Sequence, residues 1–189
     1  MAEISSFKIA ARIFGTAALA SILMAGIVTT GSAAEQPALL GPQSISYEHE
    51  QIIKELANFA KREVAHAASV QKALTVIRAH YAKEEAFVLP TLALLPQIAK
   101  GAISKDMEPA AIAMADRTKA ALPELLDEHI QITSLMNDLI EAGKADHDEE
   151  LTQLATRVAI QSLNDVEVAQ PATILIGDYL RRRRLAKAD

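Results

Sequence analysis

The feature that most constrains the fold is a polar pattern that occurs twice on otherwise apolar helix faces. It consists of a Glu-His dipeptide, then two polar residues spaced four apart, then a proline. Residues four apart lie on one face of a helix. A buried imidazole or carboxylate without a partner costs several kcal/mol, so these groups must meet one another, water or a cation inside a helical fold. The first copy comprises Glu48, His49, His80, Glu84 and Pro90, and the second comprises Glu128, His129, Gln161, Asp165 and Pro171.

Apolar residues recur at helical spacing along four segments, which begin near residues 44, 69, 109 and 151. No alternating strand pattern and no hairpin turn occurs between them. The connections within each pair of segments are short, which favours antiparallel neighbours. The sequence therefore predicts an all-α fold, an up-down-up-down antiparallel four-helix bundle made of two repeated helical hairpins.

The prolines modify the second and fourth of these helices. We expect Pro90 to kink the second helix and Pro171 to interrupt the fourth, because proline lacks an N–H and clashes with the preceding turn. The helical period of the fourth segment places Gln161, Asp165 and Val168 on the inward face.

The first residues have the layout of a secretory signal. Lys8 and Arg12 precede an uncharged apolar run over residues 13–28, and small residues follow up to Ala34. We expect a signal peptide at 1–34, and hence an exported, periplasmic protein. The alternative is an uncleaved membrane anchor, which would be the chain's contact with a membrane. We further expect a linker at 35–43, the bundle at 44–183 and a tail at 184–189.

Composition limits the chemistry. The net charge of −5 argues against nucleic acid as a partner. The chain has no cysteine, which excludes thiolate metal sites and leaves histidine and carboxylate ligands. Those ligands suit iron, manganese or zinc. No nucleophilic triad, phosphate loop or dinucleotide fingerprint points to an enzyme of another kind.

The inward polar groups are candidate metal ligands. Mutual hydrogen bonding explains any one of them alone, but groups at matched depth in both hairpins favour a shared cation. The flanking carboxylates are less defined. Glu48 and Glu128 either face solvent or orient a ligand histidine, and Glu85 is expected at the surface. The candidate ligands are His49, His80, Glu84, His129, Asp165 and Gln161.

The pattern resembles the hemerythrin-like, or HHE cation-binding, family over residues 44–180. The resemblance implies a four-helix bundle with a non-haem di-iron centre, in which carboxylates bridge two irons with terminal histidine ligands. The second copy departs from the family, since Gln161 stands where a histidine is expected. Carried over, His49 and His80 would bind one iron, Glu84 would bridge, and His129 would bind the second iron.

This departure suggests one iron, or two held unequally. A single iron would be bound by His49, His80, Glu84 and Asp165, with His129 close by. The resemblance implies that the protein binds or senses oxygen or a related small diatomic. The alternatives are an iron-handling module and a metal-free structural or interaction bundle, and an oxidase-like enzyme is less favoured.

Overall fold

The computed structural model describes residues 39–62 and 64–186, and the signal peptide expected at 1–34 lies outside this range. All regular elements of the described residues are helices, as the sequence predicts. None of these helices combines the length and apolar character needed to cross a bilayer. The α-helices are α1 (Gln43–Phe59), α2 (Ala67–Lys83), α3 (Leu89–Leu92), α4 (Leu95–Ala99), α5 (Glu108–Ala145), α6 (Glu149–Asn164) and α7 (Gln170–Leu185), and two π-helical segments are η1 (Glu84–Val88) and η2 (Asp165–Ala169).

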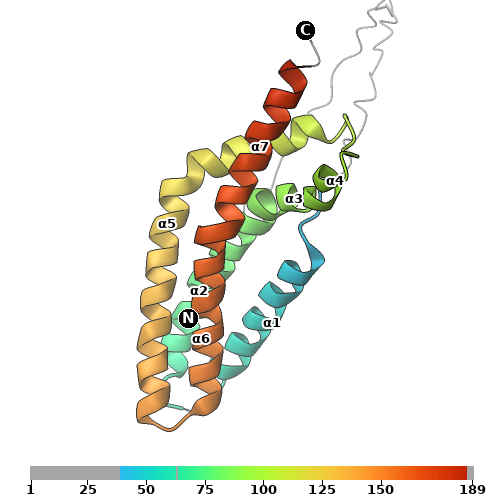
Figure 1. The fold of residues 1–189 in the computed structure, drawn as a ribbon. Helices are drawn as coiled ribbons and strands as arrows, with labels where there is room; N and C mark the ends of the chain where they lie inside the picture. Colours follow the sequence, from blue (N-terminus) through green and yellow to red (C-terminus); the bar gives the residue numbers. More distant parts are fainter. Residues whose placement is uncertain (1–38, 63, 187–189) are drawn as a thin grey trace, which may run out of the picture. The chain divides into compact units, whose positions relative to one another are not determined.

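The helices form four rods, an arrangement compatible with a helical bundle (Figure 1). The second rod is α2 continued by η1 and α3, and the fourth is α6 continued by η2 and α7. α1 packs against α2 and α6, α2 packs against α5, and α5 packs along α6 and α7. Short connections join α1 to α2 and α5 to α6, so each rod lies beside the next.

Two apolar clusters stabilise the bundle, one toward each end. The first holds Ile52 and Phe59 of α1 together with Ile77 and Met136. The second gathers side chains from α3, α5 and α7, such as Leu89. Complete burial of one large apolar side chain contributes about 1.5–3 kcal/mol. Along each rod the candidate ligands lie between the residues of these clusters, which close the site from both ends.

Each of the two π segments begins at a candidate carboxylate ligand. The backbone N–H of Leu89 donates to the carbonyl of Glu84, and that of Gln170 donates to the carbonyl of Asp165. The next residue in each case is a proline, Pro90 or Pro171. A proline offers no N–H and clashes with the carbonyl four residues earlier, so the chain passes through a wider turn instead of an α-turn.

The wide turn in η2 corrects one prediction. Val168, expected on the inward face, is 62% exposed, whereas Ala169 and Gln170 are buried. A π turn contains one more residue than an α-turn, so the residues after Asp165 are shifted by one position around the axis. Helical periodicity alone does not reveal this shift.

The long helix α5 contains Pro123 in its interior and bends along its length (Figure 1), as its proline predicts. Its first part lies very close to α7. A Cβ atom at Gly177 would lie 2.3 Å from the Cβ of Ala115, so only glycine fits at this crossing. α7 continues to Leu185, two residues past the expected end of the bundle.

Hydroxyl groups from neighbouring rods donate to two carbonyls of η1. Thr118 donates to the carbonyl of Phe87 at 3.1 Å, and Thr173 donates to that of Val88 at 2.8 Å. Both threonines are buried. These buried hydrogen bonds join the wide turn to α5 and α7.

We expect Thr173→Val to lower the free energy of unfolding by about 1 kcal/mol, because it removes a buried hydrogen bond to the carbonyl of Val88. Chemical denaturation measures the change. Thr156→Val is the matched control, since the hydroxyl of Thr156 donates to its own helix at an exposed position. Equal unfolding free energies for the two variants would contradict this account of the turn.

Candidate metal centre

The predicted ligands meet at one point inside the bundle. Five of them form two groups whose ligand atoms lie within 4.8 Å of one another, and all five are buried. Gln161 lies beside them, with its amide nitrogen 3.2 Å from Asp165 Oδ1. The first group is His80, Glu84 and His129, and the second group is His49, Glu84 and Asp165.

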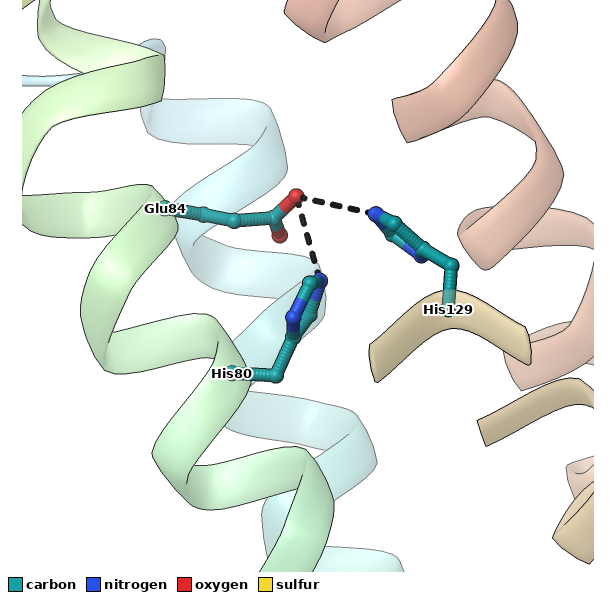
Figure 2. Close-up of side chains that lie close together, drawn as sticks. All are labelled: His80, Glu84 and His129. Carbon is teal, nitrogen blue, oxygen red and sulfur yellow. Dashed lines mark ion pairs between the residues drawn. The ribbon is translucent and has the colours of Figure 1, made fainter. Parts of the chain in front are cut away.

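Glu84 belongs to both groups and lies between them. Its Oε1 is 3.4 Å from Nε2 of His80 and 3.8 Å from Nε2 of His129, as Figure 2 shows. Its Oε2 is 3.7 Å from Nε2 of His49. Two ligand atoms that each lie about 2.1 Å from one metal ion are roughly 3.0–3.4 Å apart. The separations are long for hydrogen bonds and close to those of ligands that share a cation.

Four buried atoms at this centre have no hydrogen-bond partner among the described residues. They are Nε2 of His49, Nε2 of His80 and both carboxylate oxygens of Glu84. A fully buried carboxylate with both oxygens unpaired costs several kcal/mol. A cation would satisfy all four atoms together, so the residues fit a metal ion at each group.

The outer nitrogen of each histidine is held by a residue from another rod. Nδ1 of His80 lies 2.8 Å from Glu128, Nδ1 of His49 lies 3.0 Å from Glu85, and Nδ1 of His129 lies 2.8 Å from the hydroxyl of Ser162. With the proton on Nδ1, the lone pair of each neutral imidazole is on Nε2, which faces Glu84. Such outer partners fix the tautomer and the ring orientation of metal-binding histidines.

The flanking carboxylates therefore do more than the sequence indicates. Glu128 orients His80, the second of the two roles expected for it, and Lys83 forms an ion pair with it. Burial raises the pKa of Glu128, but the hydrogen bonds that Lys83 and His80 donate to it have the larger combined effect. The pKa is lowered overall, so Glu128 is ionised. Glu85, expected at the surface, is only partly exposed and binds both His49 and Ser46.

The histidines differ in how readily they are protonated. Burial lowers the pKa of His129 to about 4, and it lowers the pKa of His49 despite the nearby Glu84. Both are neutral at pH 7, the form that binds a metal. Burial lowers the pKa of His80, but the larger combined effect of Glu84 and Glu128 raises it above the usual value. His80 is therefore protonated more often than His49 or His129, and a metal ion that binds it must then displace that proton.

Asp165 is the second buried carboxylate of the centre. Burial and the charge of Glu84 raise its pKa to about 8, against the smaller effects of His80 and Gln161. Two neighbouring carboxylates out of water repel each other, and a proton or a cation relieves the repulsion. Asp165 therefore carries a proton at neutral pH unless a cation replaces it.

Tyr81 packs flat on the ring of His49. Their ring centroids are 3.7 Å apart with an interplanar angle of 8°. The tyrosine is buried and restricts rotation of the imidazole. His66 instead pairs with Asp146 on the surface and takes no part in the centre.

The grouping differs from the one expected for a single iron. That expectation joins His49 and His80, whereas the structure joins His80 with His129 and His49 with Asp165. The repeat explains the difference, because the histidine of each hairpin's first helix faces the polar pair of the other hairpin. The first group thus holds two histidines, and the substituted position, Gln161, lies beside the second group.

Sequence reasoning missed three contacts of the centre, those of Glu85, Ser162 and Gln170. Glu85 directly follows a ligand, and Ser162 directly follows Gln161, so neither stands out by helical spacing. The side chain of Gln170 is buried, and its amide nitrogen lies 2.7 Å from Nε2 of His129. Only the wide turn in η2 brings it to the centre.

Two surface clefts reach the centre. One, of about 370 Å³, is bordered by Asp165 and Gln161 and has Ile45 and Leu92 in its walls. The other, of about 410 Å³, is bordered by His129 and is mainly apolar. Each cleft thus has at least one candidate ligand in its lining.

Comparison of the chain with family models, curated proteins and solved structures finds no match. The functional proposal therefore rests on the sequence pattern and on the geometry of the centre.

We expect Asp165→Asn to change how the stability of the metal-free protein depends on pH. The folded state holds the Asp165 proton up to pH 8, while the unfolded chain has lost it, so the free energy of unfolding falls as pH rises. Between pH 6.5 and 8 the unmutated protein should lose about 1–2 kcal/mol more than the variant. Chemical denaturation of chelator-treated protein at several pH values measures this difference. Parallel pH curves would show that Asp165 is ionised.

Proposed function

We propose that this protein is a hemerythrin-like bundle that binds non-haem iron at the buried centre around Glu84. The observation that carries the proposal is the set of four unpaired buried atoms that face one another across the bundle. Histidine nitrogens and carboxylate oxygens without thiolate suit iron, and also manganese or zinc. The resemblance of the two Glu-His repeats to the HHE cation-binding family supports iron.

The two groups differ in donor strength, which supports an unequal centre. The first group offers two imidazoles and Glu84, and the second offers one imidazole with Glu84 and Asp165. A second imidazole favours iron more than a second carboxylate does. We infer that the first group would hold the tighter iron, and that Glu84 would also serve a more weakly held second ion.

We further propose that the ligand is oxygen or a related small diatomic. Reduced iron, when bound, supplies the electrons that such a molecule needs in order to bind. Side chains of this chain would do the rest. Glu128 and Glu85 orient the imidazoles, the two apolar clusters exclude water, and the cleft beside Asp165 admits a small molecule. The signal peptide expected at 1–34 supports an exported, periplasmic location.

Anaerobic purification, followed by iron quantitation and absorption spectra, tests the proposal. We expect the protein to retain iron, and to show a band that appears with oxygen and disappears when oxygen is removed. His80→Ala should lose most of the iron because it removes an inner ligand, whereas His66→Ala, at the surface, should retain it. A band that does not reverse would favour iron handling, and protein that retains no iron would favour a metal-free bundle.

We expect Gln161→His to raise the iron content from about one toward two per chain, because it adds a second imidazole beside the second group. Elemental analysis of variant and unmutated protein, prepared side by side, measures the change. Two tightly held irons in the unmutated protein would contradict the unequal centre.

A further inference from the structure

Gln170 is a buried amide that contacts a candidate ligand atom. Its side chain is fully removed from solvent, and its amide nitrogen donates to Nε2 of His129 at 2.7 Å. That nitrogen of His129 also lies 3.8 Å from Oε1 of Glu84. The other end of the amide, Oε1 of Gln170, is buried and has no hydrogen-bond partner among the described residues. An unpaired buried acceptor costs about 1–3 kcal/mol.

The wide turn in η2 directs Gln170 toward the centre. In an α-helix, residues five apart point about 140° away from each other around the axis. In η2 the N–H of Gln170 donates instead to the carbonyl of Asp165, five residues earlier, and both side chains are buried. The fold therefore places a second oxygen-bearing side chain of this rod beside the first group.

The first hairpin shows that the fold does not require an amide at this position. The corresponding residue is Leu89, whose N–H makes the same five-residue bond to Glu84. Leu89 is fully buried and packs in an apolar cluster. A leucine thus satisfies the turn, so the amide of Gln170 serves something other than backbone geometry.

We propose that Gln170 is a further metal ligand, which adds its side-chain oxygen to the ion held by His80, Glu84 and His129. The inference rests on the proposed metal binding at this centre. Without metal, the amide N–H₂ group pairs with the lone pair of His129. When a cation binds that lone pair, rotation of the amide by half a turn would bring Oε1 to the position of the N–H₂ group. Amide oxygens are suitable ligands for hard cations, and this one gains a partner.

The first group then has four donors, two nitrogens and two oxygens. Gln170 enters from the fourth rod, the rod in which Gln161 replaces the histidine expected from the repeat. The tighter site would thus draw on three rods rather than two. This makes the stability of α7 sensitive to metal, because Gln170 is the first residue of that helix.

Titration with Co²⁺ tests the proposal, because cobalt reports its coordination by absorption and does not depend on oxygen chemistry. We expect Gln170→Leu to weaken the tightest cobalt site by about tenfold or more, and to change its visible spectrum. Gln170→Glu should bind cobalt more tightly than the unmutated protein, because a carboxylate is a stronger ligand than an amide. Gln131→Leu, the same change at an exposed position of α5, is the matched control and should bind as the unmutated protein does.

The outcomes separate this inference from the proposed function. Failure of the unmutated protein to bind cobalt would overturn both. Normal binding by the unmutated protein, with equal or tighter binding by Gln170→Leu, would overturn the role of Gln170 alone. Circular dichroism establishes that each variant is folded. If Gln170→Leu does not fold, Gln170→Met takes its place, because methionine has a similar length and lacks the amide oxygen. A ligand role requires weaker cobalt binding by this variant, and unchanged binding would overturn it.

Discussion

The carboxylate of Glu84 lies in the middle of the bundle without a hydrogen-bond donor for either oxygen among the described residues. The rest of the centre is arranged around this unsatisfied charge. Imidazoles from α1, α2 and α5 approach it, and Asp165 approaches from the fourth rod. In water such a charge would be solvated, but here it needs a cation or a proton. The unpaired carboxylate lowers the stability of the bundle, but it is already in position to bind a cation.

Rigidity of the centre comes from contacts between rods. Each imidazole is attached to one rod and is oriented by a hydrogen bond from another, as in the pairing of His80 with Glu128. Tyr81 adds a stacked ring on His49. The apolar clusters on both sides hold the rods at fixed spacing. Ligand geometry is therefore a property of the packed bundle, and no single helix contains it.

Much of this arrangement could be predicted from the sequence, because it depends on spacing. The repeat and the helical period locate His49, His80, Glu84, His129 and Asp165 on inward faces, and all are buried. The pairing of histidines across hairpins depends on how the rods pack, and one hairpin's sequence does not contain that information. The wide turns depend on a backbone adjustment before Pro90 and Pro171 that shifts residues by one position. For this reason helical spacing places Val168 inside and gives no sign of Gln170.

The partners of the three imidazoles also differ in their access to solvent. Glu85 is partly exposed and links Ser46 to His49, and Glu128 links Lys83 to His80, whereas Ser162 behind His129 is buried. Water therefore reaches the groups that orient His49 and His80, but not the hydroxyl that orients His129. The three imidazoles of one centre thus lie behind boundaries of different depth.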